Sequence, residues 1–247
     1  MSEDASGLQR LWAEESRGVE PLCEPDRLPP AAARWRRHAL SEGALPAEAV
    51  RLEMSGRIRI GSWRRFTAIQ VIRPGSGMVW TARTRMMGLP VRGFDRLLDC
   101  RGETRWRLLG LIPVAGERDL HTTRSAAGRM AAELVWLPHA LFRSGVSWVE
   151  SGPDLAQAAL EVCGEPCHIT IRTGREGALK ALTMKRWGDP DGRGHRYADF
   201  GCLVLEESRF CGVAVPSRLR VGWFFDGEGF AQGGEFIGVH VSDARFA

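Results

Sequence analysis

Apolar and polar residues alternate along most of the chain from residue 51 onward. In the first run, Leu52, Met54, Ile58 and Ile60 share one face, and arginine and glutamate residues occupy the other. A period of two is typical of a half-buried β-strand. Eleven further runs follow, at residues 66–72, 78–86, 94–99, 103–109, 146–150, 156–162, 167–172, 178–184, 197–205, 215–223 and 236–241. The pattern therefore predicts a mainly β protein.

The segments between these runs are short and rich in turn residues. Examples are 74–77 (PGSG), 100–102 (CRG) and 175–177 (REG). Short turns of this composition join neighbouring strands as hairpins, whereas parallel strands need long crossover connections. We therefore expect the strands to be antiparallel.

Three segments show helical patterns instead. Two precede the strands, at residues 8–18 and at residues 31–43, the second opened by Pro29-Pro30. The third covers residues 122–142, with Thr122 or Thr123 as the expected N-cap and a stop near Pro138. Its apolar stripe is expected to pack against the concave face of a curled sheet and consists of Ala126, Ala127, Met130, Leu134 and Leu137.

Length and composition fit one large folded unit. The chain has 247 residues, of which 44% are hydrophobic, and no long polar linker divides it. We predict an N-terminal helical segment (1–45) followed by a single antiparallel β domain (46–247) with an inserted helix near 122–142. The expected fold class is mainly β (α+β): a large curled antiparallel sheet or half-barrel with a central helix and short N-terminal helices.

The positive charge comes almost wholly from arginine. The formal net charge is +4, and Lys180 and Lys185 are the only lysines. The arginines are spread along the sequence rather than gathered in a block, which argues against nucleic-acid binding. The N-terminus lacks the basic start and apolar run of a signal peptide, and no segment has membrane-spanning length. We therefore expect a cytoplasmic location and six reduced cysteines.

Motifs for metals, cofactors and nucleophilic catalysis are weak. The best zinc candidate, Cys163, Cys167 and His168, lies within two strands and has no second paired cluster nearby. The glycines occupy hairpin turns rather than a strand-to-helix turn, and no serine or cysteine lies in a nucleophile elbow. We therefore expect no metal and no cofactor, and we assign no catalytic residue.

Charged and aromatic side chains suggest a binding site instead. Arg129 and Glu133 lie four residues apart on the expected helix and can form an ion pair. If the helix lies inside the concave sheet, this pair can orient a polar group of a ligand; if it faces solvent, the pair means little. The chain has nine tryptophans, which either fill a core or line an apolar cavity. Those of interest are Trp80, Trp136, Trp148 and Trp223.

Several landmarks in a fixed order resemble a bacterial family known as a domain of unknown function. They include LPPAAARWRRHALSEG, GSWRRFTAIQ, RMAAELVWLPHALF and RYADFGCLVLEESRFCGVAVPSRLRVGW, and the resemblance runs from about Pro29 to Gly222. It implies that Arg83 and Asp95 occupy recurrent positions, together with the four tryptophans, Arg129 and Glu133. The expected layout is also similar to the half-barrels of bacterial lipoprotein carriers, which shelter acyl chains.

Three hypotheses about function follow. The first is non-enzymatic binding of a hydrophobic or lipid-like small molecule, with Trp80, Trp136, Trp148 and Trp223 as apolar walls. Arg83, Asp95, Arg129 and Glu133 would then supply the polar contacts. The second is an enzyme that uses Glu133 or Asp95 as an acid or base. The third is a protein interaction module that uses a sheet edge or the N-terminal helices.

Overall fold

The computed structural model describes residues 3–16, 18, 20–225 and 227–247. These residues form one sheet of thirteen strands, each antiparallel to its neighbours. The strands are β1 (Val50–Ile60), β2 (Ser62–Arg73), β3 (Gly77–Met86), β4 (Leu89–Leu98), β5 (Arg101–Leu108), β6 (Ile112–Glu117), β7 (Ser147–Gly152), β8 (Leu155–Val162), β9 (Glu165–Thr173), β10 (Leu179–Gly188), β11 (Arg196–Phe210), β12 (Val213–Trp223) and β13 (Glu235–Phe246). The predicted mainly β, antiparallel fold is confirmed.

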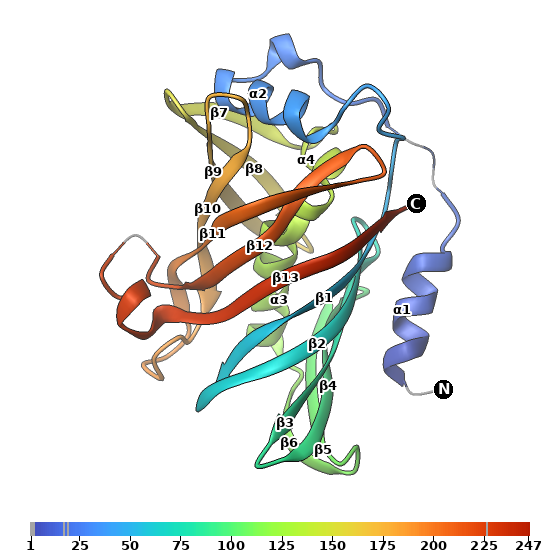
Figure 1. Ribbon diagram of the computed structural model, residues 1–247, viewed down its shortest axis with the longest axis vertical. Helices are drawn as coiled ribbons and strands as arrows, with labels where there is room; N and C mark the ends of the chain where they lie inside the picture. Colours follow the sequence, from blue (N-terminus) through green and yellow to red (C-terminus); the bar gives the residue numbers. More distant parts are fainter. Residues whose placement is uncertain (1–2, 17, 19, 226) are drawn as a thin grey trace.

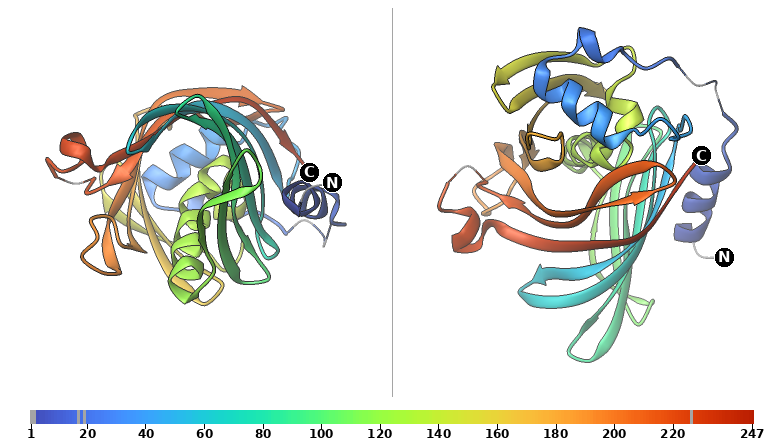
Figure 2. Two further views of the ribbon diagram at one scale, coloured as in Figure 1. Left: turned by 90° about the horizontal axis from the view of Figure 1, so that it is seen from below. Right: turned by 45° about the horizontal axis from the view of Figure 1, so that its top comes forward.

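The strand order divides the sheet into two halves that meet where β1 pairs with β13. Strands β1 to β6 step outward to one edge, the chain crosses to the opposite edge at β7, and β8 to β13 step back until β13 pairs with β1. The crossing segment contains α3 (Leu120–Glu133), the 3₁₀ turn η2 (Leu134–Trp136) and α4 (Pro138–Leu141). The sheet wraps around this segment without closing, so α3 lies along its concave face (Figure 1; Figure 2, left).

The crossing segment begins and ends differently from the single helix expected over 122–142. The N-cap is Asp119, whose carboxylate accepts a hydrogen bond from the Thr122 backbone N–H at 2.7 Å. The helix narrows to a 3₁₀ turn at Leu134, and a separate short helix starts at Pro138. Proline has no backbone N–H and favours the first position of a helix, which explains the restart.

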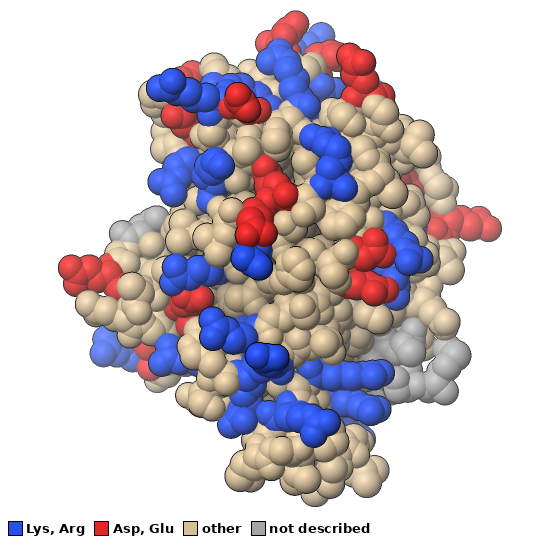
Figure 3. Space-filling view, in the orientation of Figure 1, with Lys and Arg blue, Asp and Glu red and all other residues tan. Residues whose placement is uncertain are grey.

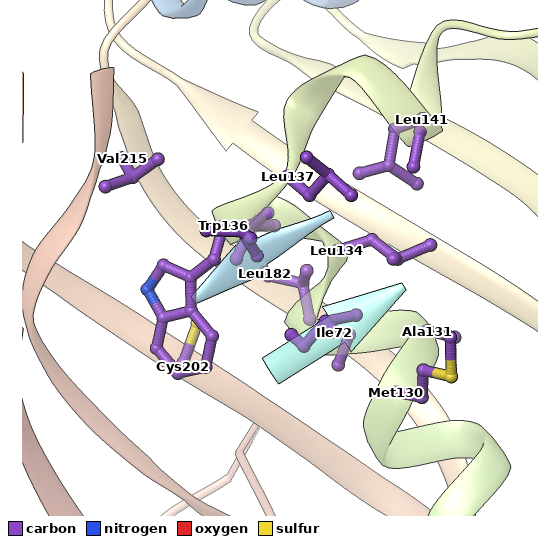
Figure 4. Close-up of a cluster of buried hydrophobic side chains, with 14 of the residues drawn as sticks. Ile72, Met130, Ala131, Leu134, Trp136, Leu137, Leu141, Leu182, Cys202 and Val215 are labelled. Atoms are coloured by element: carbon purple, nitrogen blue, oxygen red, sulfur yellow. The ribbon is translucent and has the colours of Figure 1, made fainter. Parts of the chain in front are cut away.

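The core fills the space between the crossing segment and the concave face. Met130, Leu134 and Leu137 are buried, as the helical stripe predicted. Figure 4 shows Leu134, Trp136, Leu137 and Leu141 of this segment in the buried cluster, together with Cys202 of β11. These contacts supply the burial that holds the helix in the half-barrel.

The short helices lie at two other places. Helix α1 (Glu3–Ala13) packs on the convex face, where Leu11 contacts Val71 of β2 and Val79 of β3. After a 3₁₀ turn, η1 (Pro25–Arg27), helix α2 (Pro30–Ala39) buries Trp35 against Phe142, with ring centroids 5.2 Å apart. A last helical turn, η3 (Phe230–Gly234), precedes β13.

A disulfide corrects the expectation that all six cysteines are reduced. Cys100, in the β4–β5 turn, is bonded to Cys163, in the β8–β9 turn, across 63 residues of sequence. The start of α3 lies beside both hairpins, because Thr123 accepts a hydrogen bond from the Gly102 N–H and Arg124 pairs with Glu165. The curl of the sheet brings the two turns together, which sequence spacing alone does not reveal. Cys23, Cys167, Cys202 and Cys211 are free.

Candidate functional site

A cavity of about 300 Å³ lies between α3 and the concave face of the sheet. Its walls come from both halves of the sheet, so it exists only because the sheet curls. The lining residues are Met54, Ile58, Gln70, Trp80, Asp95, Arg129, Ala132, Glu133, Val135, Trp136, Leu182, Arg186, Phe200, Cys202, Leu219, Val221, Trp223, Phe236, Ile237 and Val239. Only five of these side chains are polar or charged, namely Gln70, Asp95, Arg129, Glu133 and Arg186.

Three tryptophans form rigid parts of the apolar wall. The indole N–H of Trp136 donates to the Pro216 carbonyl at 2.9 Å, which fixes the ring and satisfies its one donor. Trp80 is buried, and the Trp223 ring packs edge-on against Phe200 at 5.2 Å between centroids. The wall is therefore preformed rather than assembled from mobile side chains.

An ion-pair cluster forms one end of the cavity. The Arg129 guanidinium donates from Nε to Glu133 Oε1 at 2.8 Å and from Nη1 to Asp95 Oδ2 at 2.9 Å. It also lies over the Trp80 ring, 4.9 Å from its centroid. Burial opposes the charged form of Arg129, but the charges and hydrogen bonds of Glu133 and Asp95 outweigh burial and raise the pKa of Arg129.

Two neutral side chains complete the cluster. Gln70 donates to Glu133 Oε2 at 2.5 Å, and the Trp106 indole donates to Asp95 Oδ1 at 3.2 Å. Gln70 is fully buried, and its Oε1 accepts no hydrogen bond from the described residues. A buried amide oxygen without a donor is costly. The cluster therefore retains one acceptor that a ligand hydroxyl or a water could satisfy.

Arg186 of β10 is a second buried cation in the same place. Its Nε and Nη2 donate to the backbone oxygen and the hydroxyl of Ser125, and its guanidinium stacks over Phe200. Among the described residues it forms no ion pair. Burial and the nearby charge of Arg129 lower the pKa of Arg186 to about 10, so the group stays charged at neutral pH. Gly128 leaves room for its stem, because a Cβ there would lie 3.1 Å from Arg186 Cγ.

A more polar pocket of about 390 Å³ adjoins the apolar cavity. Asp95, Arg129, Arg186 and Trp223 line both, so the two spaces meet at the charged residues. The polar pocket also contains His121 and His195, whose rings stack at 4.2 Å between centroids. The combined space has an apolar end and a polar end, with the cations between them.

The structure brings together most of the residues chosen from the sequence. Six of the eight line the cavity, namely Trp80, Asp95, Arg129, Glu133, Trp136 and Trp223.

Two of the eight lie elsewhere. Arg83 points outward, because strand β3 turns Trp80, Ala82 and Thr84 inward and Arg83 to the other face. Trp148 does not line the cavity either: it stacks on Phe142 at 5.6 Å and donates to the Leu141 carbonyl, beneath α2.

Sequence reasoning missed two polar residues of the cavity, Gln70 and Arg186. The alternation of inward-facing and outward-facing residues along a strand identifies both. Leu182, Met184 and Arg186 alternate with Thr183 and Lys185, which places Arg186 on the inward face of β10. Gln70 likewise alternates inward with Ala68 and Ile72 on β2.

The described part of the chain lacks two kinds of feature. No group of three or more histidine, cysteine, aspartate or glutamate residues is arranged to hold a metal ion. No helix within the described ranges is both long and apolar enough to cross a membrane.

Comparison with solved structures gives matches of low identity. A LolA superfamily protein from Nitrosomonas europaea has 8% identity and a TM-score of 0.47, over 88% of this chain and 92% of that chain. A domain from Vibrio parahaemolyticus named for outer membrane lipoprotein sorting has 9% identity and a TM-score of 0.42, over 87% and 90%. A DUF1329 family protein from Desulfovibrio piger has 12% identity and a TM-score of 0.40, over 87% and 90%.

Comparison with the curated proteins gives no match. A family model does match, and it covers residues 20–233. This range includes the crossing segment and all the residues of the charged cluster. Because the match spans most of the chain, the protein belongs to the DUF6544 family, a family of unknown function.

Proposed function

We propose that the protein binds a hydrophobic, lipid-like small molecule with an acidic polar end, without catalysing a reaction. The observation that carries this proposal is a concave cavity with apolar walls that ends at a cluster of buried charges. A mainly apolar pocket with a few fixed polar groups is typical of small-molecule sites. Burial of an alkyl chain there would contribute roughly 0.8 kcal/mol per methylene.

Arg186 is the basis for the acidic end. Asp95 and Glu133 both hydrogen-bond to Arg129, whereas Arg186 has only the two neutral oxygens of Ser125. A guanidinium binds a carboxylate or phosphate through two parallel hydrogen bonds, and such charge-assisted bonds are stronger than neutral ones. Arg186 also lines the junction of the two pockets. A ligand with its chain in the apolar cavity would therefore place its acidic group against Arg186.

The two other hypotheses have less support. As acid–base groups, Glu133 and Asp95 would need access to a substrate proton. Each carboxylate instead accepts one hydrogen bond from Arg129 and one from a neutral side chain. These contacts favour a role in holding Arg129. As a docking segment, α2 offers little apolar surface, because it buries Trp35 and all four of its alanines.

The direct test is native mass spectrometry of the purified full chain, followed by calorimetric titration with decanoate and decanol. We expect a co-purifying compound, or binding of both probes with decanoate tighter. Arg186→Gln should weaken decanoate binding about tenfold to a hundredfold, from the strength of hydrogen bonds to charged groups. Decanol binding should change little, because its hydroxyl carries no charge.

Two controls separate the site from general effects. Arg172→Gln removes an exposed arginine on β9 and should leave both titrations unchanged. Ile237→Trp enlarges a half-buried side chain on the cavity wall and should weaken both probes. If no compound co-purifies and neither probe binds the folded wild-type chain, or if Ile237→Trp has no effect on binding, the proposal is wrong.

A further inference from the structure

The outer face of strands β1 to β5 carries a dense group of exposed arginines. We call them the arginine rows; they are Arg57, Arg65, Arg83, Arg85, Arg92 and Arg107. The sheet register places Arg83 opposite Arg92, and Arg92 opposite Arg107. In the β1–β2 pair, Arg57 lies opposite Arg65. Residues far apart in the sequence thus form one strongly basic surface, which the even spread of arginines along the chain does not suggest.

The arginine rows differ from other surface arginines in their contacts. Within the described ranges of the chain, none of the six forms an ion pair. Elsewhere on the surface, exposed arginines do pair, as Arg218 does with Glu206 at 3.0 Å. Like charges directly opposite each other on a sheet are destabilising. Folding therefore gains no ion pair from this arrangement, and an anionic partner would relieve the repulsion.

Exposed apolar side chains lie at the end of the same strands. We call them the apolar tip; they are Met87, Leu89, Leu109, Leu111 and Ile112, in and beside the β3–β4 and β5–β6 turns. Met87 is 83% exposed and Leu111 is 76% exposed. The two turns adjoin, because the Leu109 N–H donates to the Pro90 carbonyl at 2.8 Å. Figure 3 shows the uncharged lower end of the molecule, where these turns lie in Figure 1, bordered by Lys and Arg.

The backbone conformation and the exposure to water both disfavour apolar residues at this tip. Met87 and Leu109 have φ angles of 49° and 54°, in the left-handed region. Asparagine, aspartate or glycine adopts this conformation more readily than methionine or leucine, and each is also more soluble in an exposed turn. The apolar side chains therefore need an explanation outside the isolated molecule.

We propose that this end of the molecule attaches to the surface of a lipid bilayer that contains anionic phospholipids. The apolar tip enters the boundary between headgroups and acyl chains, and the arginine rows contact the phosphates. Arg83 and Arg92 lie about three residues behind the turn, which at roughly 3.3 Å per residue is about 10 Å. Interfacial apolar groups enter a bilayer to a depth of about 5–10 Å, so both contacts can form together.

The combination of features distinguishes a bilayer from other anionic partners. Nucleic acids would contact the arginine rows through phosphates, but unstacked bases bind aromatic side chains, and the apolar tip is wholly aliphatic. An interfacial site needs both buried apolar area and attraction to anionic lipid. The proposal concerns the convex face and the hairpin ends, so it does not depend on the cavity.

The test is sedimentation of the full chain with vesicles of phosphatidylcholine, with and without phosphatidylglycerol. We expect binding to the anionic vesicles, loss of binding at high salt, and little binding to phosphatidylcholine alone. Arg83→Gln with Arg92→Gln should weaken binding about thirtyfold, from the roughly additive contribution of each basic residue. Leu111→Ser should weaken it independently of salt.

Matched variants provide the controls. Arg172→Gln with Arg175→Gln removes two exposed arginines from the other half of the sheet and should not change binding. Leu45→Ser removes a leucine that is 78% exposed, close to the value for Leu111, and should be neutral. Circular dichroism would verify that each variant folds.

Three results would overturn the proposal. The first is the absence of sedimentation with anionic vesicles at low salt. The second is binding to a DNA or RNA oligonucleotide that depends on Arg83 and Arg92 and not on Leu111. The third is a lipid-free dimer that Leu111→Ser dissociates, since the apolar tip would then be an interface between two copies of the chain.

Discussion

Arginine occurs in two contrasting environments in this protein. Inside the half-barrel, Arg129 donates hydrogen bonds to Asp95 and Glu133, and Arg186 donates to Ser125. On the outer face, Arg83 and Arg92 lie opposite each other with no ion pair to any described residue. A charge that is buried without a partner is costly, whereas water solvates an exposed charge. The interior therefore fixes its arginines in place, and the outer face leaves them free for a partner.

The two environments separate charged residues that stabilise the fold from arginines whose placement the fold does not require. In the interior cluster, the Arg129 guanidinium is held by the carboxylates of Asp95 and Glu133. Removal of one member leaves the others buried with unbalanced charge. Removal of an outer arginine only relieves repulsion. Substitutions at the two places should therefore change stability by very different amounts.

The largest expected loss of stability follows Arg129→Met. This change leaves the Asp95 and Glu133 carboxylates in the interior without their common partner, which typically costs about 3–5 kcal/mol. Urea unfolding followed by tryptophan fluorescence would measure it. Arg83→Met is the control on the outer face, with an expected change within about 0.5 kcal/mol. Equal changes in the two variants would contradict the contrast between the two environments.

The next largest effect concerns the disulfide that links the two halves of the sheet around this interior. Cys100→Ser removes the Cys100–Cys163 bond, which closes a loop of 63 residues. Loss of a bond of this kind is expected to lower the free energy of unfolding by about 2–4 kcal/mol. Cys211→Ser, at an exposed free thiol, is the control. Equal unfolding midpoints for the wild type and Cys100→Ser would show that the bond adds nothing to the half-barrel.

Much of the fold could be predicted because the signals are local. Alternation such as that of Leu52, Met54 and Ile58 marks one strand, and short turns determine antiparallel pairing. Strand β6 (Ile112–Glu117) was missed because all six of its residues are exposed and so no alternation marks it. The N-cap was misplaced because Asp119, three residues earlier than Thr122, supplies the capping carboxylate.

The site was harder to predict because it depends on which strands meet. The pair Arg129 and Glu133 could be read from helical spacing, and strand parity would have excluded Arg83 and added Arg186. No local pattern shows that Cys100 meets Cys163. Nor does any show that Arg83, Arg92 and Arg107 share a row, since only the register of β3, β4 and β5 aligns them.

A third prediction concerns the pH dependence of stability that results from a buried histidine, His139. Burial, reinforced by the charge of Arg143, lowers the pKa of His139 to about 4. The unfolded chain binds this proton near pH 6.5, whereas the folded chain resists it until about pH 4. Stability from this group is therefore present above about pH 6.5 and is lost as the pH falls to about 4. The loss is up to about 3 kcal/mol.

The pH test requires a variant that lacks the ionisable ring. Urea unfolding of the wild type and of His139→Leu would be measured at a series of pH values across this window. Because acidic groups also titrate there, both proteins should lose stability on acidification, but the wild type should lose more. Parallel curves would contradict the assignment of the buried, neutral state to His139.

The smallest expected change in stability comes from an arginine on the outer face. Arg92→Thr removes the middle charge of the row formed by Arg83, Arg92 and Arg107. Threonine suits a strand, and the loss of like charges opposite one another should raise the free energy of unfolding by roughly 0.2–1 kcal/mol. The gain should shrink at high salt, where screening already weakens the repulsion. A substitution that stabilises the fold and weakens vesicle binding would show that Arg92 serves the partner rather than the fold.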